Sequence, residues 1–135
     1  MKIVKKGLII GVVNLVAGLI LNRVLHFLFP ALVQEYQGGL FRPWTDPLMT
    51  AYFLHPFILG IALAYFWSLF GKDIKGKTGP EKALSFAKLY FVIATIPGMF
   101  ISLTSFKISF LMVVSWTLVG FIQAYLAGLI LAREK

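Results

Sequence analysis

Apolar residues fall into four long runs, at positions 7–29, 47–70, 83–106 and 108–132. Each run has 23 to 25 residues, whereas about 20 suffice to cross a hydrocarbon core roughly 30 Å thick as a helix. The runs hold 96 of the 135 residues, which leaves too little for a separate soluble domain. The pattern therefore predicts an all-α integral membrane protein, an antiparallel four-helix bundle that forms a single transmembrane domain over residues 1–135.

Turn and cap residues separate the runs. The longest connection, residues 30–46, ends in Asp46-Pro47, a typical helix start with an N-cap followed by proline. The polar turn 71–82 contains Thr78-Gly79-Pro80-Glu81, which predicts a second capped start. The last two runs are joined by a turn of barely residues 105–107, which takes in the end of the third run, so these helices should form a tight antiparallel hairpin.

The charges are distributed unequally between the two ends of the predicted bundle. The net charge is +8, although only 13% of residues are charged and the mean hydropathy is +0.87. Ten of the thirteen basic residues fall at one end: Lys2, Lys5, Lys6, Lys72, Lys75, Lys77, Lys82, Lys88, Arg133 and Lys135. Because short cytoplasmic loops carry the Lys/Arg excess, we expect a multi-pass protein of the cell (inner or plasma) membrane with both termini in the cytoplasm, and no nucleic-acid partner.

Lysines precede the N-terminal run, as they do the apolar region of a signal peptide. The apolar part of this run is too long for one, and no A-x-A cleavage pattern follows it, so we expect it to be retained. The chain has no cysteine, which excludes disulfides, thiol nucleophiles and thiolate metal sites.

Small residues recur at helical spacing in every run. Helices in lipid associate through such residues because they allow close backbone approach. The stripes are Gly7, Gly11, Asn14, Gly18 and Asn22; Pro56, Gly60, Ala64 and Ser68; Ala87, Ala94, Gly98 and Ser102; and Gly120, Ala124 and Gly128. They predict a closely packed bundle.

Two amides lie at matching depth in the first and last runs. Asn14 and Gln123 are each roughly 10 to 13 Å from the same end of the bundle. We interpret them as an interhelical polar pair worth about 1 kcal/mol, with a polar gate as the alternative. In the third run, Pro97-Gly98 predicts a kink.

The opposite half of the membrane holds most of the other polar residues of the spans. We hypothesise a ligand-binding or headgroup-binding cluster, the alternative being a bundle whose polar groups satisfy one another. Arg23 could instead extend to the headgroups or pair with Asp46 or Glu35. The cluster comprises Asn22, Arg23, His26, Tyr52 and His55.

His55 stands out because it precedes Pro56. Proline has no N–H, so the Tyr52 carbonyl should lose its usual helical partner. A histidine at this depth could fill the gap, titrate or bind a ligand.

Cofactor and enzyme chemistry have little support. His26 and His55 on antiparallel helices resemble a pair of axial haem ligands, but their depths differ by roughly 7 Å. The spans offer no carboxylate for a metal site and no Ser-His-Asp set. We therefore expect no metal, no cofactor and no enzymatic activity.

The last run is also similar to a known group. Trp116, Gly120, Gln123, Ala127 and Gly128 resemble the last helix of small four-span membrane proteins of bacteria and archaea that have no assigned activity. The glycines and Asn14 of the first run are compatible with that group. The resemblance implies the architecture alone.

Three functions remain open. The first is a non-enzymatic accessory or assembly subunit that packs against other membrane proteins, against lipids or against a second copy. The second is a small-ligand or lipid-binding or transport module that uses the polar cluster. The third is a haem-binding electron-transfer subunit.

Overall fold

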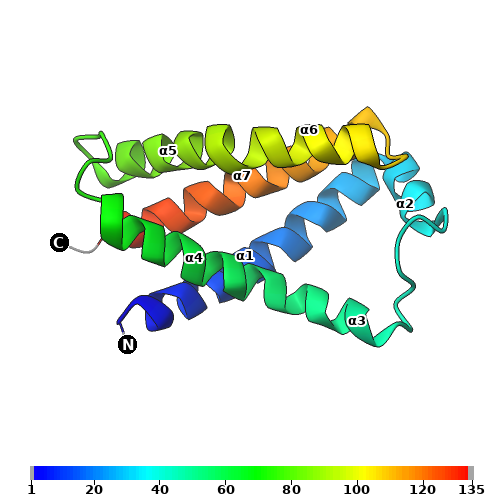
Figure 1. Ribbon diagram of the computed structural model, residues 1–135, viewed down its shortest axis with the longest axis horizontal. Coiled ribbons are helices and arrows are strands. Elements are labelled where there is room, and N and C mark those ends of the chain that lie inside the picture. Colours follow the sequence, from blue (N-terminus) through cyan, green and yellow to red (C-terminus); the bar gives the residue numbers. More distant parts are fainter. Residues whose placement is uncertain (1, 134–135) are drawn as a thin grey trace.

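The protein is described by a computed structural model over residues 2–133 (Figure 1). Met1, Glu134 and Lys135 lie outside the described residues, and so does the charge that Lys135 contributes to the expected basic end. The described elements are α1 Lys2–Leu28, α2 Pro30–Gln37, α3 Pro47–Thr50, the 3-10 helix η1 Ala51–Leu54, α4 His55–Phe70, α5 Gly79–Tyr90, the π-helix η2 Phe91–Thr95, α6 Ile96–Ser105 and α7 Phe110–Ala132.

These elements form four long apolar helices: α1, α3–η1–α4, α5–η2–α6 and α7. They span 23 to 27 residues each, and the second has the predicted bounds, Pro47–Phe70. All are long and apolar enough to cross a membrane. The all-α antiparallel four-helix prediction is confirmed, and the chain is a small polytopic membrane protein. The remaining differences concern the helix ends: the first and third helices begin before their apolar runs, at Lys2 and Gly79, and the fourth begins later, at Phe110.

The helices pack as two pairs, α1 with α4 and α5 with α7, and α7 also contacts α1 (Figure 1). Both termini and the α4–α5 loop lie at one end, here called the terminal end (Figure 1). The other end, with α2 and the α6–α7 turn, is called the loop end.

Glycine allows the backbones of α1 and α4 to touch. A Cβ added at Gly7 would lie 2.5 Å from Ile61 Cα, and one added at Gly60 would overlap the Gly7 carbonyl. In the other pair, a Cβ at Gly128 would lie 2.8 Å from Ala83 Cα. Real Cβ atoms do not approach so closely, so these contacts require glycine. The predicted close packing is therefore present at the terminal end.

At some other stripe positions the prediction of close packing is wrong. A Cβ at Gly98 or Gly120 would meet nothing within 4 Å, and Ala94 and Ser68 are exposed. Crossing helices touch closely only near the crossing point, so small residues farther along lie beside open space.

Three helix starts have side-chain caps. The Thr78 hydroxyl accepts the Glu81 N–H at 3.4 Å, and the Glu81 carboxylate accepts the Lys77 N–H at 2.8 Å. The Asp46 carboxylate accepts the Leu48 N–H at 2.9 Å. Both predicted caps are confirmed. Ser109 caps α7, which therefore begins two residues later than the apolar run suggested.

The second and third long helices stay continuous at their internal prolines, Pro56 and Pro97, but each has an irregular turn just before the proline. The Tyr52 carbonyl accepts the backbone N–H of His55 in the 3-10 turn η1. The backbone thus closes the gap that the His55 side chain was considered able to fill. In the third helix, the irregularity expected at Pro97-Gly98 is a π-turn just before it, where the Ile96 N–H bonds to the Phe91 carbonyl.

Candidate functional site

The loop end is closed by α2, an element that the sequence had suggested only as part of a long connection. Pro30 starts this helix in its first turn, and Leu32 is buried against Met112 and Val113 of α7. Proline and a single inward leucine were the only signals for it, since eight residues carry too short an apolar pattern.

Glu35 of α2 binds the start of α7. Its two carboxylate oxygens accept the backbone N–H and the hydroxyl of Ser109, each at 2.6 Å. The Ser109 hydroxyl in turn accepts the Met112 N–H at 3.1 Å. A carboxylate is favoured here because the first N–H groups of a helix are unpaired and carry partial positive charge. Glu35 therefore fixes α2 to α7 and is not free to pair with Arg23, which is exposed.

Tyr36 centres a group of four rings, the outer aromatic cluster, made of His26, Tyr36, Phe41 and Trp116. The Trp116 indole N–H donates to the Tyr36 hydroxyl at 2.6 Å. The Tyr36 ring lies 5.4 Å from His26 and 4.9 Å from Phe41, centroid to centroid. Burial raises the pKa of Tyr36 above 10.0, so its hydroxyl stays protonated at neutral pH. The cluster joins α1, α2, the following loop and α7.

The structure divides the five predicted site residues between two regions. Asn22 and His26 are half-buried on α1, where His26 contacts Tyr36. Tyr52 and His55 are exposed, on η1 and at the start of α4. The segment that leads into α4 diverges from α1 at the loop end (Figure 1). Tyr52 acts on Tyr36 only through a minor electrostatic effect on its pKa. Ligand binding by the five residues stays a prediction.

The α3–η1 segment, residues 47–54 (here the outer arm), contains no buried residue. Leu48 and Leu54 are 62% and 58% exposed, and Trp44 stacks on Phe53 beside them at 6.2 Å. The arm leads out from α4, while α1 continues in another direction (Figure 1). Its apolar side chains therefore have little contact with the rest of the bundle.

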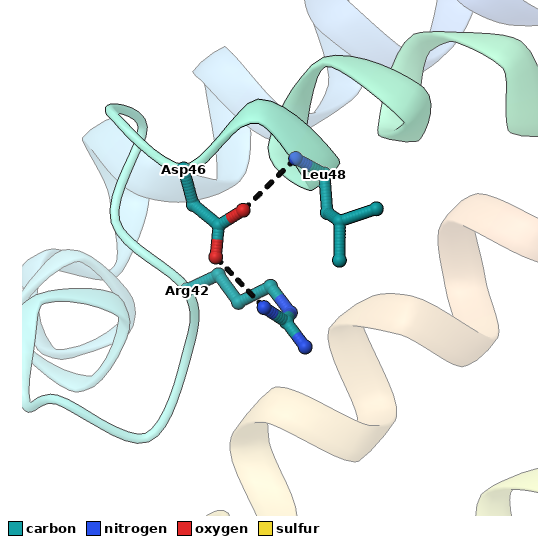
Figure 2. A network of polar contacts seen from close by, with 3 residues as sticks. All are labelled: Arg42, Asp46 and Leu48. Atoms are coloured by element: carbon teal, nitrogen blue, oxygen red, sulfur yellow. Dashed lines mark hydrogen bonds and ion pairs between the residues drawn. The ribbon is translucent and has the colours of Figure 1, made fainter.

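A short polar network fixes the start of the arm (Figure 2). The Arg42 guanidinium donates to Asp46 Oδ2 at 2.7 Å, while Asp46 Oδ1 caps α3. The hydrogen bond from Arg42, with the bond from Leu48 second, holds the pKa of Asp46 below 3.8. Asp46 is thus already paired and does not bind Arg23.

Polar side chains inside the spans differ in how they are satisfied. Ser102 donates to the Gly98 carbonyl at 2.8 Å, and Thr104 donates to the Phe100 carbonyl at 3.0 Å. Such bonds to the preceding turn satisfy the hydroxyl locally. Within the described part of the chain, the side chains of Tyr52 and His55 make no hydrogen bond, although His55 lies roughly 12 Å along its helix from Pro47.

The Asn14–Gln123 contact differs from the expected pair of side chains. Gln123 Nε2 donates to the backbone carbonyl of Asn14 at 3.0 Å. Gly18 leaves room for it, since a Cβ there would lie 3.0 Å from Gln123 Nε2. The Asn14 side chain is fully buried and neither of its polar atoms has a partner. An unpaired buried amide costs about 1–3 kcal/mol, so the Asn14 side chain weakens the bundle.

Haem or metal binding would need ligands brought together. The described residues include no group of three His, Cys, Asp or Glu side chains able to hold a metal ion. The His26 ring contacts Tyr36, and no contact joins it to His55. The arrangement of two facing imidazoles is not formed.

Comparison with known proteins adds no relative. No family model matches the chain, and neither does any curated protein or solved structure. The resemblance of the last helix to small four-span proteins thus rests on the sequence pattern alone.

Proposed function

We propose that this membrane protein is a non-enzymatic accessory or assembly subunit, and that its outer arm packs against a transmembrane helix of another protein. The observation that carries the proposal is the state of Tyr52 and His55. Both are exposed in a membrane-spanning helix and make no hydrogen bond within the described chain.

Lipid alone is a poor cover for these groups. A polar or ionisable side chain in contact with hydrocarbon is costly, and such residues usually face protein or a water-filled cavity. A partner helix that carries a hydrogen-bonding side chain at the depth of His55 would remove that cost. The apolar residues of the arm, Leu48, Phe53 and Leu54, would supply the surrounding contact area.

A photoreactive phenylalanine analogue at Phe53 tests this proposal in native membranes. Phe100 of α6 is the matched control, because it is also an exposed aromatic residue of a span. We expect a protein adduct of one defined mass from position 53 and only lipid adducts from position 100. Adding His55→Phe to the Phe53 probe should reduce the yield several-fold, because the polar contact is lost.

Other results would contradict the proposal. Lipid adducts alone from both positions would show that lipid covers the arm. An adduct of small mass from position 53 alone would favour the ligand-binding alternative for Asn22, Arg23, His26, Tyr52 and His55. An adduct of twice the chain mass would assign the arm to self-association.

We also propose that the terminal end faces the cytoplasm, because nine of the twelve basic residues in the described part of the chain lie there. The chain has no cysteine, so single cysteines can be labelled without background. Gln37 and Lys77 are exposed on opposite ends. On intact cells, an impermeant thiol reagent should label Gln37→Cys and not Lys77→Cys. The reverse pattern would overturn the orientation.

A further inference from the structure

A groove of about 560 Å³ lies at the terminal end, between the last turn of α4, the α4–α5 loop and α5. Its lining is apolar on one side and polar on the other. Phe66, Phe70, Leu89 and Ile93 form the apolar part. Lys75, Lys88, Ser85 and Asp73 form the polar part.

The polarity of the groove follows its depth in the membrane. Along the third long helix, Ser85 and Lys88 of α5 come before Leu89, at the end of α5, and Ile93 of η2, which lie farther into the span. Lys88 lies roughly 13 Å along the helix from Gly79, a depth from which a lysine side chain reaches back toward the headgroups. The groove is therefore cationic near the headgroups and apolar toward the hydrocarbon.

The charge of the groove favours an anion. Among the described residues, neither Lys75 nor Lys88 has an ion-pair partner, and Asp73 is the one carboxylate in the lining. The groove between α6 and α7 offers a contrast: it has about 290 Å³ and its lining carries no charged residue. Of these two grooves, the one at the terminal end combines an apolar channel with cations.

The loop that carries Lys75 is held in place. Ile74, its neighbour, is 8% exposed and belongs to the main core. On one side the Asp73 N–H bonds to the Phe70 carbonyl at 3.0 Å, and on the other the Lys77 N–H bonds to Glu81. Binding a ligand beside Lys75 thus requires little ordering of the loop, which favours affinity.

We propose that this groove binds one anionic phospholipid, with its phosphate between Lys75 and Lys88 and an acyl chain along Phe66, Leu89 and Ile93. Cationic pockets beside transmembrane helices at this depth are suited to anionic headgroups. The apolar half distinguishes a lipid from free phosphate, which would leave Leu89 and Ile93 without a role. The site is separate from the outer arm, so it stands independently of the subunit proposal.

The test uses the full chain in nanodiscs that contain phosphatidylglycerol and phosphatidylcholine with identical acyl chains. Native mass spectrometry measures the lipid retained on the released protein. We expect preferential retention of one phosphatidylglycerol, and a loss of affinity of about tenfold or more in the double variant Lys75→Gln/Lys88→Gln. The matched control, Lys2→Gln/Lys5→Gln, removes the same charge from the same end and should retain the lipid.

A second variant pair tests the apolar half. Ile93→Trp should fill that part of the groove and lower the retention of phosphatidylglycerol while both lysines remain. Ile58→Trp, at an exposed position of α4, should not lower it. Soluble glycerol phosphate in moderate excess should not displace the lipid.

Four results would overturn the proposal: equal retention of the two lipids, equal loss in both lysine variants, no effect of Ile93→Trp, or displacement by glycerol phosphate. Melting curves verify that each variant is folded. If the lysine variant does not fold, the Ile93→Trp pair and the glycerol phosphate competition decide.

Discussion

The two ends of this bundle are held together by different kinds of contact. At the terminal end, α1 meets α4 at Gly7, Gly11 and Gly60, and α5 meets α7 at Gly128, with backbone against backbone. At the loop end the contacts are made by side chains of α2, mainly Glu35 and Tyr36, and the outer arm has no buried residue. The terminal end is thus closed by backbone contact, whereas α2 closes the loop end only in part, through polar bonds and the burial of Leu32.

The charges follow the same division. Among the described residues, the terminal end carries nine basic and two acidic residues, and the loop end carries three basic and two acidic residues. A strongly cationic, closely packed end is well suited to a fixed position in anionic headgroups. A nearly neutral, open end with unbonded polar groups is better suited to a protein contact. The difference indicates that the two binding proposals belong at opposite ends.

Gly60→Ala is the change expected to have the largest effect on the terminal end. The new methyl group would overlap the Gly7 carbonyl and lie 2.9 Å from the Gly11 nitrogen, so the free energy of unfolding should fall by about 3 kcal/mol. Gly120→Ala is the control, because open space surrounds that position. The free energy of unfolding of the Gly120→Ala variant should stay the same or rise by up to about 1 kcal/mol, because alanine favours the helix more than glycine does. If both variants changed the free energy of unfolding in detergent equally, the close packing at the terminal end would not depend on Gly60.

Glu35→Ala should have the next largest effect, now at the loop end. It removes two charge-assisted bonds to Ser109 and should lower the free energy of unfolding by about 2 kcal/mol. Gln34→Ala, at an exposed neighbour on the same short helix, should change it by less than about 0.5 kcal/mol. If both variants unfold alike, α2 does not hold this end closed.

Asn14 lies between the two ends and gives an effect of opposite sign. Its unpaired amide is buried, so Asn14→Leu, which is similar in size, should raise the free energy of unfolding by about 1 kcal/mol. Gln123→Leu should lower it by about 1 kcal/mol, because it removes the bond to the Asn14 carbonyl. If both variants lowered the free energy of unfolding, the Asn14 side-chain amide would have a hydrogen-bond partner in the membrane.

Asp46 should show the smallest effect, and only with changing pH. Its pKa is lowered in the folded state by the bonds from Arg42 and Leu48. Its contribution is therefore present above the ordinary value of 3.8 and is lost as the pH falls through the lower folded value. The melting temperatures of the native chain and Asp46→Asn should differ slightly at pH 6 and converge toward pH 3. If the difference in melting temperature did not change with pH, the Arg42–Asp46 ion pair would contribute nothing to stability.

The sequence by itself determined the four helices, their antiparallel order and the unequal charge of the two ends. These features depend on local properties: a run long enough to cross the membrane, a cap such as Thr78 or Asp46, and a connection too short for any other path. Glycine spacing also indicated close packing, correctly for Gly7, Gly60 and Gly128.

Only the tertiary structure decided which small residues touch and which polar residues meet. Gly120 and Gly128 have the same spacing pattern, yet only Gly128 lies at a crossing, because the crossing point depends on the whole helix pair. Likewise, the residue pattern along one helix does not predict that Gln123 bonds to the backbone of Asn14. Nor does it predict that Glu35 bonds to Ser109, 74 residues away. These contacts depend on how rigid helices diverge in space, which no local pattern encodes.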